Sequence, residues 1–428
     1  MSIGETSIDG VPQSSVRASR ADVRKGRARK FWTALHRWVG LVAGAYLVVA
    51  GLTGSVLAFW EDIDEWLNAD IMTVAPPSAD ASYRPLGEIF GAARALMPPG
   101  VAPSTNSPIF MKLPRHRHSA IWVAYIAGLP DRANLTDSDK PKFDLSKIEG
   151  HTIFVDPYRA KITGERLQSK MSEPFSQPFV YMMMSLHCAL LWEPFGRLAI
   201  AAVGMFLLVS TIAGLALWWP KRGKWKSAIG VKANAAPERL VYDVHKTVGA
   251  VLGLVLVVSI FSGLYMNFKT PWRALASLVS PVRELPTKTK SEPAEGRSPL
   301  GPDAVAAAAD RLFLGGRLQM LQFPLGADGT YVVGKHADDE VNQAGTGRLA
   351  VIDQYSGKVV ASQDPHDYTA GEHFFEWQYP LHSGEAFGDA GRAFMLAFGL
   401  VPLTLYVTGF IHWRHKRRAR RAIERRRA

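Results

Sequence analysis

Residues 38–60 read WVGLVAGAYLVVAGLTGSVLAFW, a run without Asp, Glu, Lys or Arg. At about 1.5 Å of rise per residue, a helix of this length crosses a hydrocarbon layer of about 30 Å. Three later windows of similar length share these properties: 198–220, 247–268 and 393–413. The first run is too long for a signal peptide and lacks a small-residue cleavage site. The sequence therefore predicts four membrane-spanning helices.

The distribution of charge predicts how these helices are oriented. The chain has 428 residues, with 50 Lys and Arg against 38 Asp and Glu, a net charge of +12. Segments 1–37, 220–246 and 414–428 hold 24 Lys and Arg against 6 Asp and Glu, whereas the remainder holds 26 against 32. Basic segments beside uncharged spans face the cytoplasm, so both termini are expected there. The Arg-rich tail then contacts lipid, and no nucleic-acid partner is expected.

The chain also repeats its own pattern, which indicates an internal duplication. His187 and His382, with the Gly-Arg pairs that end at Arg197 and Arg392, recur at a constant offset of 195. His36 and His245 recur at an offset of 209, and glycine follows each of them four and eight positions later. The predicted unit is a span, a soluble domain and a second span, used twice.

The predicted fold class is thus an α-helical integral membrane protein with four transmembrane helices and two α+β domains outside the membrane. Each domain is expected to contain one helix followed by antiparallel strands. Strands are predicted at 118–126, 151–156, 331–333 and 348–353, and a helix of the second domain at 304–314. The predicted division is: 1–30 disordered and basic; 31–60 first span; 61–180 first domain; 181–220 entry helix and second span; 221–240 cytoplasmic loop; 241–268 third span; 269–378 second domain; 379–413 entry segment and fourth span; 414–428 basic tail.

The four repeated histidines are candidate haem ligands. Topology places His36 and His245 at the inside face and His187 and His382 at the outside face. A six-coordinate b-type haem requires two neutral imidazoles in an apolar slot between helices, so one haem is expected at each face. Glycines one and two turns after the ligand would leave room for a flat macrocycle. The single cysteine excludes cysteine-ligated iron–sulfur clusters and covalent c-type haem.

Arg197 and Arg392 are candidate partners of the haem propionates. His412 is a further candidate inner ligand, although the duplication does not support it. The alternative interpretation of all these residues is structural: histidines and arginines at span ends act as interfacial anchors, and spaced glycines serve close helix packing.

Other histidines receive weaker interpretations. His116 and His118 are expected at the surface, because flanking arginines oppose a metal cation. His366 and His373, near Glu372, are candidates to line a substrate approach. His415 is expected to be solvated.

Together these motifs resemble the PepSY-associated transmembrane family, from about residue 30 to 417. The resemblance rests on Leu35-His36-Arg37-Trp38-x-Gly40, on the Leu-His-x8-Gly-Arg elements at 187 and 382, on Thr53-Gly54 and Ser262-Gly263, and on the loop strands with Asp156 and Asp353. It implies a bacterial inner-membrane protein whose segments 61–180 and 269–378 are periplasmic PepSY-like domains. Some members of this family are haem-containing reductases of ferric siderophores.

The resulting hypothesis is a di-haem b protein that passes electrons across the membrane and reduces a periplasmic ferric siderophore or other chelate. Phe374, Trp377 and Tyr379 are possible contacts of the chelate. The donor is a quinol, a cytoplasmic reductase or a diffusible reductant, because no Gly-x-Gly-x-x-Gly motif follows a strand in the cytoplasmic segments. The main alternative is a PepSY regulatory or binding protein that acts on a periplasmic protease or envelope partner without redox activity. A transporter is less favoured, since no span contains a buried carboxylate.

Overall fold

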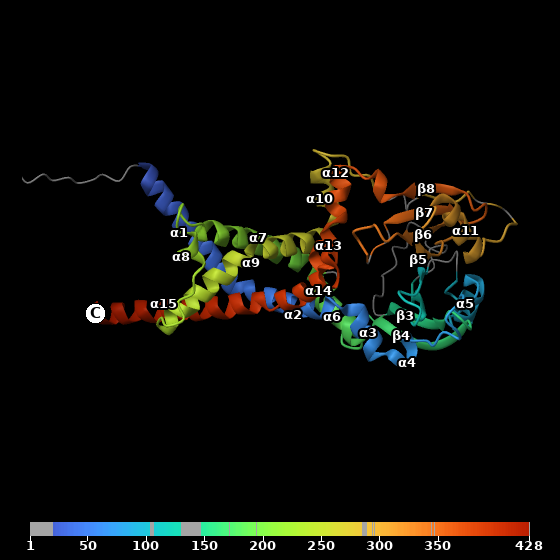
Figure 1. The fold of residues 1–428 in the computed structure, drawn as a ribbon, viewed down its shortest axis with the longest axis horizontal. Coiled ribbons are helices and arrows are strands. Elements are labelled where there is room, and N and C mark those ends of the chain that lie inside the picture. The colour runs from blue at the N-terminus through green and yellow to red at the C-terminus, as the bar shows by residue number, and fades with distance from the viewer. Residues whose placement is uncertain are drawn as a thin grey trace, which may run out of the picture.

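The molecule is elongated, with a helical bundle at one end and a β-sheet at the other (Figure 1). The computed structural model describes residues 20–102, 107–129, 147–170, 172–193, 195–284, 289–292, 294, 296–343, 345 and 347–427. The C-terminus lies at the end of the bundle farthest from the sheet (Figure 1). We call the two ends of the bundle the sheet end and the tail end.

The bundle contains the helices that were predicted as membrane spans. Within the described residues, three segments are long and apolar enough to cross a membrane: α7 (Phe195–Trp218), α9 (Pro237–Asn267) and the segment Glu385–Arg427. The last segment comprises a 3-10 turn (Glu385–Phe387), α14 (Gly388–Phe398) and α15 (Val401–Arg427). A bent pair, α1 (Arg20–Val42) and α2 (Gly44–Leu57), passes the same test with a bend of 56° and provides the fourth.

The prediction that 1–30 is disordered is wrong for residues 20–30, which form the first turns of α1. Once the span has nucleated a helix, each added residue costs little, and Ala, Arg and Lys are good helix formers. Residues 1–19 lie outside the described residues. The basic tail is likewise helical, since α15 continues to Arg427.

Helices α2 and α14 approach each other closely at two glycines. A Cβ atom built on Gly51 would lie 2.5 Å from the carbonyl oxygen of Gly399 and 2.9 Å from Cγ of Pro402. The Ser55 hydroxyl donates a hydrogen bond of 2.7 Å to the carbonyl of Leu396 across the same contact. Without Cβ atoms, the two backbones pack directly, as in other membrane helix pairs with small residues.

Shorter helices connect the bundle with the sheet and close the tail end. They are α3 (Trp60–Leu67), α4 (Ala69–Met72), α6 (Phe179–Ala189), α8 (Trp225–Ile229), α10 (Lys269–Ala276), a 3-10 turn (Pro365–Asp367), α12 (Ala370–Glu376) and α13 (Gln378–Ser383). Helix α8 lies at the tail end, and the others at the sheet end (Figure 1).

Eight strands of the described residues form one antiparallel sheet in the order β4-β3-β2-β1-β5-β6-β7-β8. Their bounds are β1 Ile109–Lys112, β2 Ile121–Ala127, β3 Glu149–Asp156, β4 Lys161–Lys170, β5 Arg317–Gln322, β6 Thr330–His336, β7 Arg348–Asp353 and β8 Val359–Gln363. The four predicted strands correspond to β2, β3, β6 and β7. The predicted start at His118 is too early, because Ser119 instead forms an isolated bridge with Thr73 and β2 begins at Ile121.

The two predicted soluble domains are joined through β1 and β5, which the sequence analysis did not anticipate. These strands pair with Phe110 opposite Gln322 and Lys112 opposite Met320. Two helices, α5 (Leu86–Arg94) and α11 (Pro302–Leu312), cover one face of this sheet. They share a single core with its strands, in which Ile89, Val305, Ile109, Leu321 and Ile352 are fully buried.

A buried ion pair fixes the sheet to the bundle. Asp64 of α3 accepts hydrogen bonds of 2.9 and 2.8 Å from the two terminal guanidinium nitrogens of Arg166 on β4. Their side chains are 1% and 11% exposed. Arg166 also lies over the ring of Phe154, 5.3 Å from its centroid. Since α3 follows the first span almost directly, this pair links the sheet to the bundle.

Helix α12 is held at its N-terminus by two sets of contacts. Thr369 and Glu372 form a capping box, in which each side chain accepts a hydrogen bond from the backbone N–H of the other residue. Arg283 binds the Glu372 carboxylate through its guanidinium at 2.7 Å. The Arg283 hydrogen bond, followed by that from the Thr369 backbone, lowers the pKa of Glu372 to about 2.

The lowered pKa of Glu372 predicts a dependence of stability on pH. The carboxylate stabilises the folded state above its ordinary pKa of 4.5, and this contribution is lost as the pH falls towards 2. We expect Glu372→Gln to lower the melting temperature at pH 7 and the difference from wild type to shrink below about pH 4. Thermal unfolding in detergent from pH 3 to 8 measures both. A difference that is constant across this range would contradict the assignment.

Candidate functional site

The four repeated histidines lie in two pairs, one towards each end of the bundle. At the sheet end, His187 of α6 and His382 of α13 have ring centroids 6.0 Å apart and ring planes 74° apart. Towards the tail end, His36 of α1 and His245 of α9 have centroids 6.3 Å apart and planes 70° apart. We call these the sheet-end pair and the tail-end pair. The structure therefore brings together the histidines that the repeat places in equivalent positions.

His187 is fixed against α2 by its Nδ1 atom. This nitrogen lies 3.0 Å from the carbonyl oxygen of Ala50 and 3.0 Å from the hydroxyl oxygen of Thr53. A carbonyl only accepts hydrogen bonds, so Nδ1 carries the proton and the lone pair lies on Nε2. The ring packs on Gly54, where an added Cβ would lie 3.2 Å from Cε1 of His187.

His382 has the same surroundings on α9. Its Nδ1 lies 3.0 Å from the carbonyl oxygen of Ser259 and 2.9 Å from the hydroxyl oxygen of Ser262. A Cβ on Gly263 would lie 3.3 Å from Cε1 of the His382 ring. A carbonyl, a hydroxyl three residues later and a glycine one residue after that thus form one seat for each ring of the sheet-end pair.

The tail-end pair is held in nearly the same way. Nδ1 of His245 lies 3.0 Å from the carbonyl of Leu405 and 3.0 Å from the hydroxyl of Thr408, and its ring faces Gly409. Nδ1 of His36 lies 2.9 Å from the carbonyl oxygen of Ser210 and 3.2 Å from the hydroxyl of the same residue. The His36 ring faces Gly214 on α7, where a Cβ would lie 2.8 Å from Cε1.

These arrangements fit two imidazoles that bind one metal centre from opposite sides. Each metal–nitrogen bond is about 2 Å and the nitrogen lies about 1 Å from its ring centre, so the two centroids should be about 6 Å apart. In histidines that bind a metal, the second nitrogen usually donates to a carbonyl or hydroxyl, which fixes the tautomer and the ring orientation. Both pairs meet both conditions, whereas histidines that serve only as interfacial anchors need meet neither.

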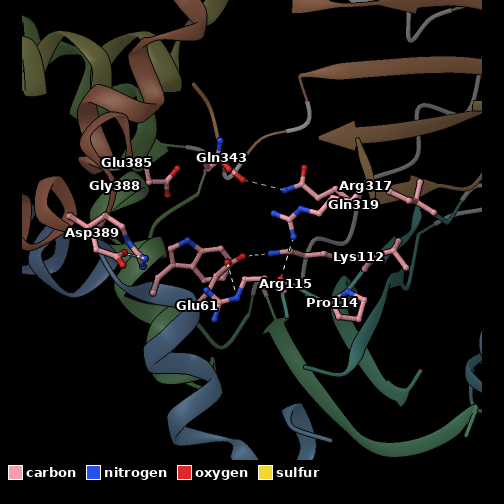
Figure 2. Close-up of a pocket in the computed structure, with 14 residues that line it drawn as sticks. Glu61, Lys112, Pro114, Arg115, Arg317, Gln319, Gln343, Glu385, Gly388 and Asp389 are labelled. Atoms are coloured by element: carbon pink, nitrogen blue, oxygen red, sulfur yellow. Dashed lines mark hydrogen bonds and ion pairs between the residues drawn. The ribbon is translucent and has the colours of Figure 1, made fainter. Parts of the chain in front are cut away.

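A polar cleft lies between the sheet and the sheet end of the bundle (Figure 2). Its volume is about 230 Å³. From the sheet it is lined by Lys112, Arg115, Arg317, Gln319 and Gln343, and from the bundle by Trp60, Glu61, Glu385, Asp389 and Arg392. Figure 2 shows the Lys112 side chain pointing at Glu61, with which it forms an ion pair.

Most cations of the cleft already have acidic partners. Arg115 binds Glu61 at 3.2 Å and Asp62 at 3.1 Å. Arg317 differs, because its guanidinium has a hydrogen bond of 3.3 Å to the carbonyl of Arg115 and no carboxylate partner among the described residues. Arg317 is therefore the cation of the cleft that is available to an anionic or oxygen-rich ligand.

The chain matches a protein-family model over most of its length. Residues 33–416 match the model described as PepSY-associated TM region, which covers both histidine pairs and the sheet. The chain belongs to the PepSY-associated transmembrane family. With its apolar helices, this membership makes it a multi-pass membrane protein with PepSY domains. No curated protein matches the chain.

In this PepSY-associated chain, both predicted propionate partners are engaged elsewhere. Arg197 binds Glu193 and, at 2.9 Å, the side-chain oxygen of Asn267. Arg392 donates hydrogen bonds of 2.9 Å to the carbonyl of Ala58 and 2.6 Å to the carboxylate of Asp62. A carboxylate from a cofactor would have to displace these partners.

Arg37 is a residue that the sequence analysis passed over. Its Nε atom is buried and has no hydrogen-bond partner among the described residues, and its guanidinium lies 5.4 Å from the ring centroid of Trp38. A buried guanidinium nitrogen without a partner is costly. Arg37, next to His36 in the sequence, therefore keeps hydrogen-bonding capacity for a carboxylate at the tail end of the bundle, whereas the two predicted arginines belong to the sheet end.

The predicted role of the glycines is met only in part. Gly40 has open space where a Cβ would stand, as room for a macrocycle requires. A Cβ on Gly44 would instead lie 2.9 Å from the Tyr406 ring, and one on Gly253 would lie 2.6 Å from the Leu215 side chain, so these glycines serve close helix packing. Three of the four glycines that face the histidine rings, Gly54, Gly263 and Gly409, directly follow a hydroxyl residue, and the Thr53-Gly54 and Ser262-Gly263 motifs were the signal for two of them.

Of the remaining candidates, His412 lies near the tail-end pair, close enough to His245 for an electrostatic interaction, whereas the others interact with nearby carboxylates. His412 packs on Tyr242, with ring centroids 5.3 Å apart. His366 binds Asp364 at 2.8 Å, and His373 binds Glu376 at 3.0 Å. His116 lies 3.2 Å from Glu65.

Three further observations concern the predicted chelate contacts and metal ligands. Phe374 packs on Phe261, 6.0 Å between centroids, and with Trp377 and Tyr379 it is absent from the cleft lining. His415 has a buried Nδ1 without a partner in the described part of the chain. The described residues contain no group of three His, Cys, Asp or Glu side chains suited to a metal ion.

Proposed function

We propose that this protein carries electrons across a bacterial inner membrane through two b-type haems and reduces a ferric siderophore or similar chelate. His187 and His382 would hold one haem, and His36 and His245 the other. The observation that carries the proposal is the geometry of the two pairs, with centroids 6.0 and 6.3 Å apart and every Nδ1 hydrogen-bonded. A haem iron between two imidazoles accepts and releases one electron at a time.

The separation of the pairs suits transfer across a bilayer. His245, which belongs to the tail-end site, and Ser262, which belongs to the sheet-end site, both lie on α9. The stretch of helix between them measures about 25 Å along its axis, most of a hydrocarbon layer of about 30 Å. Electrons that enter near the tail end would thus leave near the sheet end.

The charge distribution supports the orientation in this proposal. The tail end carries the 414–428 segment, with nine Lys and Arg against one Glu, and the basic loop 220–246. By the positive-inside rule, this end would face the cytoplasm, and the sheet, as two PepSY domains, would face the periplasm. The two halves of the sheet repeat one strand order outward from β1 and β5, which supports an internal duplication.

At the periplasmic end, the cleft is the proposed site of the chelate. Its net charge is nearly balanced by internal ion pairs. Arg317 presents guanidinium hydrogen-bond donors to oxygen-rich ligands, whereas the amides of Gln319 and Gln343 already donate to backbone carbonyls. One electron converts the bound Fe(III) to Fe(II). Oxygen-donor chelators hold the softer Fe(II) less tightly, so the reduced iron leaves.

At the cytoplasmic end, a groove supports a lipid-soluble quinol as the donor. The groove has a volume of about 440 Å³ and is lined by Arg29, Trp32 and apolar residues of α7. Ala213 lines the groove, and the next residue, Gly214, contacts the His36 ring. An apolar groove with one cation at its rim accommodates an isoprenoid tail and a polar head group.

The direct test is the visible spectrum of the protein purified from cells with ample haem. We expect a reduced b-type α-band and about two haems per chain. After reduction under anaerobic conditions, addition of a ferric chelate should reoxidise the band and produce Fe(II), trapped by a ferrous indicator. A colourless protein from the same cells would contradict the proposal. It would favour a PepSY protein that regulates or binds an envelope partner.

A further inference from the structure

An exposed apolar face follows the third span. Helix α10 begins at Lys269, almost directly after α9 ends at Asn267. The backbone N–H of Val279 donates to the carbonyl of Ala276 at 2.9 Å, so a helical turn continues past the helix end. Leu275, Leu278 and Val279 are 59%, 80% and 93% exposed. Their spacing places them on one face, which we call the α10 patch.

The direction of α10 places this patch at a membrane surface. Helix α9 is a predicted span with an uncharged stretch that ends at Phe268, so α10 starts where the hydrocarbon layer ends. Figure 1 shows α10 running across the direction of the spans at their sheet end and projecting beyond the bundle. A helix in this position lies along the boundary between acyl chains and head groups.

The charge of the segment fits phospholipid. Residues 269–283 contain Lys269, Arg273 and Arg283 and no Asp or Glu. Helix α3, which follows the first span in the corresponding way, is acidic, and its carboxylates bind Lys112, Arg115 and Arg166 of the sheet region. The acidic helix therefore packs under the sheet. The basic helix carries an apolar face and Lys269, which has no acidic partner among the described residues, whereas Arg273 and Arg283 are bound within the protein.

We propose that the α10 patch docks on the phospholipid leaflet at the sheet end of the bundle. Leu275, Leu278 and Val279 insert at the level of the upper acyl chains, and Lys269 lies at the level of the phosphates. Continuity with α9 favours lipid over a second copy of the chain, because α9 ends at the membrane surface and α10 begins at that same surface.

Docking of this patch also positions the segment that leads to the sheet-end pair. The residues after the patch hold α12: the Gly371 N–H donates to the Ser280 hydroxyl at 2.9 Å, and Arg283 binds Glu372. Helix α12 leads directly into α13, which carries His382. The leaflet thus supports α12 from one side, while Tyr265 of α9 stacks on Phe375 from the other, 4.4 Å between centroids.

The test measures the depth of the patch in the full chain in phospholipid nanodiscs. In a Cys188→Ala background, Leu278→Cys and Val279→Cys are labelled separately with the environment-sensitive dye NBD. The matched control is Leu96→Cys, which is 47% exposed and follows α5 at the far end of the molecule from the spans (Figure 1). Each sample is compared with and without phospholipid spin-labelled near the head group, so that quenching inside the protein cancels.

We expect blue-shifted NBD emission and loss of intensity with spin-labelled lipid at positions 278 and 279, and neither change at position 96. Because positions 278 and 279 are labelled in separate variants, one of them still gives a result if the other variant folds poorly. The proposal is overturned if positions 278 and 279 behave like position 96. It is equally overturned if they are shielded only in discs that hold two copies, since a second chain would then cover the patch. Neither outcome depends on haem content, so the proposed function is tested separately.

Discussion

Replacement of His187 or His382 by alanine is expected to remove about half of the bound haem, because the haem of the sheet-end site then keeps only one axial ligand while the other haem keeps both. His36→Ala and His245→Ala should each remove the other half. Haem per chain is measured by absorbance of the pyridine adduct after purification. His366→Ala is the matched control, since this histidine is exposed and binds Asp364 away from both pairs. Its haem content should equal that of the wild type.

Double substitutions identify the partners. His187→Ala combined with His382→Ala lies within one proposed site and should lose no more haem than either single variant. His187→Ala combined with His245→Ala affects both sites and should lose nearly all haem. The reverse pattern would show that the ligands are paired differently along the bundle. Equal haem content in all variants would show that these histidines serve only helix packing.

The sequence predicted the spans and the paired histidines because both depend on patterns that one segment carries by itself. A window of more than 20 residues without charge predicts a membrane span independently of the neighbouring segments. The two constant offsets of the repeat assign the four histidines to equivalent positions. The bend of 56° between α1 and α2 escaped prediction. It occurs at Ala43 without a proline, next to Gly44, whose close approach to Tyr406 of α15 is a contact between distant segments.

Contacts between distant segments were the part that the sequence did not reveal. Pairing of β1 with β5 joins strands from opposite halves of the chain, and short strands do not specify their partners by composition. The seats of the histidines depend on Nδ1 contacts between helices, so Thr53 and Ser262 were visible as a motif but without a role. Arg197 and Arg392 were predicted from charge alone, and only the structure shows that Glu193 and Asp62 already bind them.

Loss of the Asp64 carboxylate is expected to be the most damaging single change outside the histidine pairs. Asp64→Ala leaves the guanidinium of Arg166 buried without its acidic partner, which costs about 3–5 kcal/mol. The melting temperature in detergent should fall by several degrees. The matched control is Glu88→Ala, which breaks the Arg84–Glu88 pair, whose side chains are 54% and 46% exposed. An exposed pair contributes about 0–1 kcal/mol, so this variant should melt close to the wild type.

A double substitution separates two contributions to the lost stability: the cost of leaving the Arg166 charge buried without a partner, and the loss of the ion pair itself. Asp64→Leu combined with Arg166→Met replaces both ions with apolar side chains, and such exchanges are often neutral. The double variant should therefore recover most of the stability that Asp64→Ala loses. The apolar setting of Phe154, fully buried beneath the guanidinium, favours this recovery. If the double variant melts as early as Asp64→Ala, the ion pair specifies how the sheet sits on the bundle, and the haem content of the sheet-end site should then fall together with the melting temperature.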